Sequence, residues 1–227
     1  MLWAWERPDD LEGIDTARVG VAYLAKTLQL GQDDVAVLNR RQPLRLPADA
    51  YRIPVVRIET APRTTPMLSP AQARRVIDEI TALARPGTPA VQIDYDAAYS
   101  QRSFYAGIAA GVRGGLPADV RLSITALASW TLFDRWIDAL PVDEAVPMLF
   151  RMGADSEAVR RHLRLGGGIR ATRAAGHLGI ATDEPLAGLP AGRHVWIFSS
   201  RTWTPEAAQR AISEVTRWQG TVSCPSS

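Results

Sequence analysis

Short apolar runs alternate with polar or amphipathic segments along most of the chain. Eight runs have the length and residue types of β-strands, and several alternate apolar with polar positions. They span residues 2–6, 19–25, 53–59, 90–96, 121–129, 145–152, 175–182 and 194–200. Apolar positions recur with helical spacing in the segments between the later runs. These predicted helices span residues 70–85, 101–114, 131–139, 155–164 and 205–218.

This order of elements predicts the fold class. Strands that alternate with helices form βα units and a parallel sheet. Eight such strands predict an α/β fold, a compact (β/α)8 TIM-type barrel, and 227 residues exceed the lower limit of about 200 for that fold. Helices are expected to be short or missing in the first third, because residues 31–52 read mostly as loop. A doubly wound open sheet is the alternative, although no GxGxxG follows the first strand.

Composition bounds the domain and its cofactors. We expect residues 1–220 to form a single barrel domain and residues 221–227 a C-terminal tail. The only cysteine, Cys224, lies in that tail, which excludes a disulfide within the chain. Without cysteine pairs or an HExxH spacing of histidines, the sequence predicts neither a metal site nor a cofactor.

Charge and hydropathy limit the classes of partner that the protein is expected to bind. The net charge is +2 and Lys26 is the only lysine, so no basic field for nucleic acid is expected. No apolar run approaches the ~20 residues of a transmembrane segment. The chain passes from Met1 into an apolar run without the basic start of a signal peptide. Removal of an export leader would leave no trace here, so the compartment stays unknown.

The run from residue 90 to residue 96, AVQIDYD, carries the main chemical signal. Successive strand side chains point to opposite faces, so Gln92, Asp94 and Asp96 share one face. The apolar residues of the other face can pack beneath helices, which directs the polar face into the barrel. Buried carboxylates are costly unless they are paired or functional. We therefore expect this face to be a site or a satisfied ion-pair network with Arg102 or Arg151.

Paired carboxylates suggest hydrolysis of a glycosidic bond, in which one acid protonates the leaving oxygen and one carboxylate acts as base or nucleophile. Asp96, nearest the barrel mouth, is the candidate acid. Asp94, one layer deeper, can raise the pKa of Asp96 through like-charge repulsion. Further candidates lie at predicted strand ends or offer an apolar face or a guanidinium to a sugar. They are Trp5, Glu6, Glu59, Gln92, Arg102, Trp130, Arg151, Asp183, Glu184 and Trp203.

Several of these segments resemble known families. The register Gln92-Ile93-Asp94-Tyr95-Asp96 resembles the Asp-x-Asp-x-Glu strand of chitinase-type glycoside hydrolases, with Gln92 in place of the first acid and Asp96 in place of the catalytic glutamate. MLFR, residues 148–151, resembles the Met-x-Tyr-Asp of that superfamily, and Trp203 stands where it has a tryptophan after the last strand.

A longer set of segments is similar to a bacterial family known as domain of unknown function number 3142. The set comprises LWAWERPDDL, GVAYLA, QIDYDAAYSQRSFY, LSITALASW, VPMLFRMG and ATDEPL. That resemblance implies a barrel related to glycoside hydrolases and carries no assigned activity.

These features support two principal hypotheses. The first is a glycoside hydrolase that acts on a polysaccharide through carboxylates at the C-terminal face of the barrel. The second is a non-catalytic barrel that binds carbohydrate or another small-molecule ligand, or serves as a scaffold. A hydrolase or lyase for a non-sugar substrate is a third, since this fold hosts many chemistries.

Overall fold

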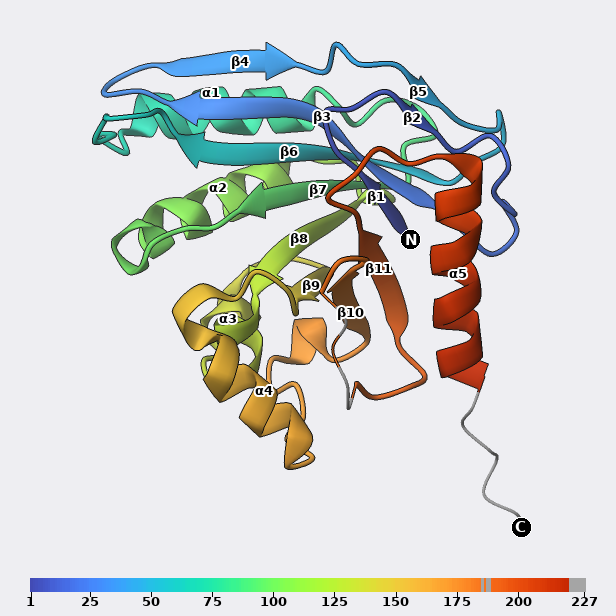
Figure 1. Cartoon of the computed structure of the whole chain (residues 1–227). Coiled ribbons are helices and arrows are strands. Elements are labelled where there is room, and N and C mark those ends of the chain that lie inside the picture. The colour runs from blue at the N-terminus through green and yellow to red at the C-terminus, as the bar shows by residue number, and fades with distance from the viewer. Residues whose placement is uncertain (185, 187–188, 221–227) are drawn as a thin grey trace.

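The computed structural model describes residues 1–184, 186 and 189–220, and within them eight parallel strands form a closed barrel (Figure 1). The first strand pairs with both the second and the last, which closes the sheet. The strands are β1 (Leu2–Ala4), β3 (Val21–Leu30), β6 (Arg52–Thr60), β7 (Ala90–Tyr95), β8 (Arg121–Leu127), β9 (Glu144–Met148), β10 (His177–Ala181) and β11 (His194–Phe198). The predicted (β/α)8 barrel is confirmed, and the closure excludes the open-sheet alternative.

Helices cover the outside of the later strands. They are α1 (Pro70–Thr81), α2 (Arg102–Gly115), α3 (Ala128–Leu132), α4 (Ser156–Arg164) and α5 (Pro205–Gly220). The first is capped by Ser69, whose hydroxyl accepts from the amide of Gln72, while the Gln72 side chain accepts from the amide of Ser69. This reciprocal cap satisfies two amides that the helix itself cannot. The predicted helix 131–139 is instead α3 followed by the 3₁₀ turn Trp136–Ala139.

The first third of the barrel is built without helices, as predicted. Residues 1–69 contain no α-helix. Where a helix would follow β3, the chain turns back as β4 (Val35–Asn39), antiparallel to β3, and Figure 1 shows it as the outer edge beyond that strand. Val35 and Val37 of β4 pack against the core that contains Val76 and Ile80 of α1. The prediction of loop over residues 31–52 was therefore wrong for β4 and for the short strand β5 (Leu44–Arg45), which pairs with β2 (Asp9–Asp10).

Apolar side chains fill the inside of the barrel and the space beneath the helices. The interior cluster includes Trp3, Val55, Val146, Trp196 and Phe198. A larger outer cluster joins β6, β7 and β8 to α1 and α2, and a third joins β1, β3 and β11 to α5. Polar side chains lie at both ends of this interior. Arg121, Glu144 and His177 are in contact at the N-terminal end, whereas active sites of this fold lie at the mouth, at the C-terminal ends of the strands.

Two further expectations concern the C-terminal tail and membrane-spanning helices. The predicted tail 221–227, with Cys224, lies outside the described residues, and the division into one domain and a tail stays a prediction. Among the helices that the structure describes, none combines the length and the apolar character required to cross a bilayer.

Candidate active site

A cavity of about 190 Å³ opens at the C-terminal ends of the barrel strands. Its walls come from segments that follow β1, β8 and β9 and from the upper part of β6 and the end of β7. We call it the mouth pocket. The polar and aromatic residues that line it include Trp5, Arg57, Asp96, Phe150, Arg151 and Asp155. Active sites of this fold lie at this face of the barrel, so position alone makes the mouth pocket the candidate site.

The alternation predicted for β7 is confirmed. Val91, Ile93 and Tyr95 belong to the outer core beneath α1 and α2. On the opposite face, Gln92 is fully buried in the barrel, where its oxygen accepts from Trp3 Nε1 and its amide nitrogen donates to Ser123 Oγ, both at 2.9 Å. Gln92 therefore lies below the mouth with its side chain satisfied by protein, which argues against the prediction that it contacts substrate.

One layer higher, Asp94 is held by two neighbouring strands. Arg57 Nη1 of β6 lies 2.8 Å from Asp94 Oδ2, and Thr125 Oγ1 of β8 donates to Asp94 Oδ1 at 2.6 Å. The register explains the pair, because Arg57 lies directly opposite Asp94 in the β6–β7 ladder. With 2% of the residue exposed, Asp94 is a buried, fully paired carboxylate. Its partner is Arg57, so the predicted pairing with Arg102 or Arg151 was wrong.

Arg57 connects this pair to the pocket wall. Its guanidinium also donates through Nε to Glu59 Oε2 at 3.3 Å and lies 5.5 Å from the centre of the Trp5 ring. Glu59 accepts a second hydrogen bond from Gln29 at 2.9 Å. Glu59 is thus committed to neighbours on β3 and β6, whereas Trp5 lines the mouth pocket as predicted for a sugar platform.

Asp96, the first residue after β7, differs from Asp94 in its exposure and in its lack of partners. It is exposed at the mouth pocket and forms no hydrogen bond or ion pair with any residue that the structure describes. Its pKa is raised to about 6, chiefly because its carboxyl group is buried against the pocket and also because of the negative charge of Asp94, while the positive charge of Arg57 partly opposes the shift. The side chain as a whole is open to solvent, yet surrounding protein displaces enough water from the carboxyl to favour its neutral form.

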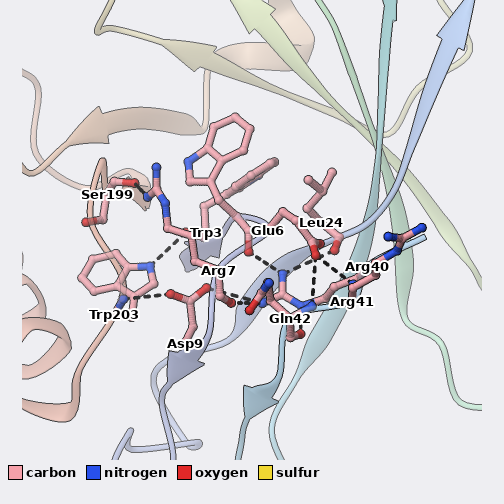
Figure 2. A network of polar contacts seen from close by, with 11 residues as sticks. Trp3, Glu6, Arg7, Asp9, Leu24, Arg40, Arg41, Gln42, Ser199 and Trp203 are labelled. Atoms are coloured by element: carbon pink, nitrogen blue, oxygen red, sulfur yellow. Dashed lines mark hydrogen bonds and ion pairs between the residues drawn. The ribbon is translucent and has the colours of Figure 1, made fainter. Parts of the chain in front are cut away.

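The remaining predicted acids are held in structural contacts. Glu6 accepts from the backbone amides of Arg41 and Gln42 at 2.8 and 3.0 Å and faces the β4–β5 connection instead of the mouth pocket (Figure 2). Glu184 accepts from the backbone amide of Arg151 at 3.0 Å, and Asp183 lies 4.0 Å from the Arg151 guanidinium.

Glu184, which accepts from the amide of Arg151, supports an unusual backbone at that residue. Its φ of +48° lies in the left-handed region, which residues other than glycine seldom adopt. Such strain persists where neighbours hold it and is concentrated at functional sites. Arg151 lines the mouth pocket, and 60% of its side chain is exposed, so its predicted role as a substrate anchor fits its position.

Three other residues predicted to contact the sugar lie away from the pocket. Arg102, at the start of α2, pairs with Asp134 at 2.6 Å and lies 4.8 Å from the ring centres of both Tyr99 and Trp136. Trp203 is 2% exposed and donates through Nε1 to the carbonyl of Trp3 at 2.9 Å. Trp130 is 5% exposed and packs 5.0 Å from Trp136. Their burial or pairing argues against the sugar contacts predicted for them.

Figure 2 shows the network that ties the helix-free side of the mouth together. Arg40, directly after β4, donates to the carbonyls of Trp5, Arg7 and Gln42 and, at 3.5 Å, to that of Leu24. It also lies 3.6 Å from Asp9, whose other carboxyl oxygen accepts from the Trp203 amide at 2.8 Å. The network thereby joins the segments after β1, β4 and β11 and fixes the backbone of Trp5 at the pocket.

The sequence analysis missed two charged residues of the pocket, Arg57 and Asp155. Arg57 could have been found, because it shares the inward face of its strand with Val55 and Glu59. Asp155 carries no such signal, since it lies at the end of the 3₁₀ turn Gly153–Asp155, beyond the strand.

The other cavities lie elsewhere. A larger cavity of about 360 Å³ lies between α5 and the N-terminal ends of β1 and β11, lined by residues that include Arg18, His194 and Gln209. The N-terminal end of a barrel contributes to stability rather than catalysis, so the mouth pocket remains the candidate. Within the described part of the chain, no three His, Cys, Asp or Glu side chains are grouped as a metal site would require.

Comparison with known proteins adds little beyond the fold. No family model and no curated protein matches the chain, so the resemblance to the family numbered 3142 stays a prediction. Among solved structures, the chain is similar to the spore cortex-lytic enzyme SleL of Bacillus cereus, with 15% identity and a TM-score of 0.48. The match covers 80% of this chain and 50% of SleL, so the chain spans about half the length of that enzyme. At this level of similarity the comparison carries no argument about function.

Proposed function

We propose that this protein is a glycoside hydrolase whose active site is the mouth pocket and whose general acid is Asp96. The observation that carries the proposal is the contrast between two aspartates two residues apart. Asp94 is buried and fixed by Arg57 and Thr125, while Asp96 is unpaired and opens to the pocket with its pKa raised to about 6. Two acids whose environments separate their roles in this way are typical of acid–base catalysis.

The proposed chemistry follows from that contrast. Below about pH 6 the Asp96 carboxyl is mostly protonated and can donate its proton to the glycosidic oxygen as the bond to the sugar breaks. Asp94 is a positioning residue in this scheme, because its negative charge beneath Asp96 helps to keep the acid protonated. Arg57 holds Asp94 in place and prevents it from turning toward the substrate.

The walls of the pocket suit a sugar ring. Trp5 and Phe150 offer aromatic carbon, and Met148 and Met152 add apolar surface. Sugars bind to such walls through their C–H faces, while polar groups fix their hydroxyls. Arg151, with most of its side chain exposed, is the proposed polar anchor.

A non-catalytic carbohydrate-binding barrel is the second candidate, and one observation favours it. In the chitinase-type pattern, the middle acid corresponds to Asp94, and here both of its oxygens are engaged by Arg57 and Thr125. A protein that still bound carbohydrate but no longer cleaved it would keep the walls of the pocket, while its carboxylates would be held in contacts with other protein groups.

The experiment that separates the candidates measures cleavage and binding together. Release of reducing ends is followed for a panel of chitin, cellulose, peptidoglycan sacculi and acidic exopolysaccharides, with co-sedimentation as the measure of binding. The hydrolase proposal predicts cleavage by the wild type and a loss of about 10²- to 10⁴-fold in kcat for Asp96→Asn, with binding retained.

Asp119→Asn is the matched control, because Asp119 is an exposed aspartate at the N-terminal end of β8, away from the mouth. An unchanged rate for Asp96→Asn would refute the proposed acid. Binding without cleavage of any polysaccharide would establish the second candidate.

A further inference from the structure

A hydrolase of the proposed kind requires a second carboxylate, and the paired acids near the mouth do not supply one. Glu6 is bound to two backbone amides, Glu59 to Arg57 and Gln29, and Glu184 to the amide of Arg151. Asp94 is fixed by its two neighbours. None of these four carboxylates lines the mouth pocket.

The geometry points to Asp155 as the second catalytic carboxylate, acting as the general base. This inference rests on the proposed function. Asp155 lines the same pocket as Asp96, is exposed, and makes no side-chain hydrogen bond or ion pair within the described residues. It occupies the N-cap position of α4, yet its side chain does not accept from the helix amides that an N-cap aspartate usually satisfies. The side chain is therefore free to act in the pocket.

The local field suits a base. The first turn of a helix carries a partial positive charge, which favours a negative charge at its N-terminus. Asp155 lies at this end of α4, whereas burial and the charge of Asp94 favour the neutral acid at Asp96. The two carboxyl groups thus have different surroundings, as the separate roles of an acid and a base require.

The topology indicates which mechanism the pair supports. Asp96 follows β7 and Asp155 follows β9, and β8 lies between these strands. The two acids therefore reach the pocket from strands that are not neighbours, and we assign to them the wider of the two separations that glycosidases use. Carboxyl groups about 6.5–9.5 Å apart leave room for a water molecule and give inversion, whereas a retaining pair is only about 5–5.5 Å apart.

The proposed step is balanced as follows. Asp155 takes a proton from water while the water oxygen forms a bond to the anomeric carbon. The bond from that carbon to the leaving oxygen breaks with its electron pair on the oxygen, and Asp96 protonates that oxygen. The product has the opposite anomeric configuration to the substrate.

The test compares Asp155→Asn with Asp96→Asn on two substrates of the same sugar. One is the polysaccharide that the wild type cleaves, and the other is its dinitrophenyl glycoside, whose leaving group departs without protonation. Loss of the acid should spare the dinitrophenyl substrate, while loss of the base should lower kcat by about 10²- to 10⁴-fold on both. Glu157→Gln is the matched control, because Glu157 is an exposed acid on the first turn of the same helix and does not line the pocket.

The outcomes separate the inference from the function on which it rests. Proton NMR of the first-formed sugar from the wild type should show inversion. Retention, or wild-type rates for Asp155→Asn on both substrates, would overturn the role of Asp155 and leave Asp96 and the hydrolase intact. Absence of cleavage by the wild type would instead refute the proposed function and this inference with it. A melting temperature equal to that of the wild type would exclude misfolding as the cause of a loss in Asp155→Asn.

Discussion

Arg40 provides the sharpest test of how the barrel closes where helices are missing. Only 10% of its side chain is exposed, and it donates to four backbone carbonyls besides facing Asp9, whose side chain is 1% exposed. Arg40→Met would leave Asp9 as a buried carboxylate without its nearest cation. Removal of one partner of a buried ion pair lowers the free energy of unfolding by about 3–5 kcal/mol. This is a large part of the total for a typical domain, which is about 5–15 kcal/mol.

The assay is urea unfolding followed by circular dichroism at two pH values. We expect the midpoint for Arg40→Met to fall by more than about 1 M urea at neutral pH. Burial already raises the pKa of Asp9 despite the hydrogen bond from the Trp203 amide and the charges of Arg40 and Arg7. Because the pKa of Asp9 is raised in the folded state, ionisation of Asp9 destabilises the fold as the pH rises. Removal of Arg40 should raise the pKa of Asp9 further. The deficit should therefore shrink as the pH falls toward about 4.

Two companion variants make the reasoning refutable. Arg40→Lys keeps the charge without the planar set of donors and should recover only part of the loss. Adding Asp9→Asn to Arg40→Met removes the unpaired charge and should make the double variant more stable than the sum of the two single effects. A loss below about 1 kcal/mol for Arg40→Met, or an equal loss at acidic and neutral pH, would show that the network does not stabilise the mouth as argued.

Three further predictions concern the pocket and its support. Arg57→Met should move the pKa of Asp96 above about 6, because the charge of Arg57 lowers it, and the alkaline limb of the pH–rate profile should move to higher pH. Trp5→Ala should weaken glycan binding by about 1 kcal/mol, or roughly fivefold in Kd by co-sedimentation, whereas Tyr99→Ala, at an exposed aromatic outside the pocket, should not. Lys26→Met should destabilise the fold by about 1.5 kcal/mol in urea unfolding, because Lys26 lies 2.5 Å from Glu79 of α1; an unchanged midpoint would show that this pair is replaced by the neighbouring Arg75.

The barrel was predictable because each of its strands can be recognised from the local sequence alone. Each is a short apolar run with breakers on either side, and the alternation in β7 correctly separated the outward Val91 and Ile93 from the inward Gln92 and Asp94. The hairpin strand β4 escaped prediction for the opposite reason. It is an edge strand with only part of each side chain buried, and it lies between polar turns, so its pattern resembles a loop.

The site was harder to predict because it depends on which strand ends meet. The sequence indicated that Asp94 and Asp96 face the barrel, but the register that places Arg57 opposite Asp94 comes only from the closed sheet. Glu6 and Asp183 stand at strand ends as catalytic acids would, yet the folded chain turns them to Arg41, Gln42 and Arg151. Strand position therefore identifies candidates, and long-range pairing decides which of them stay free.

The pH dependence of kcat/KM tests the central claim most directly. Measured on the cleaved polysaccharide from about pH 5 to about pH 8, it reports the pKa values of the essential groups in the free enzyme. If Asp96 is the acid, activity falls as the pH rises, with an apparent pKa of about 6. The same profile in Asp119→Asn should be unchanged. An activity independent of pH over this range, or the same alkaline limb in the residual activity of Asp96→Asn, would contradict the account.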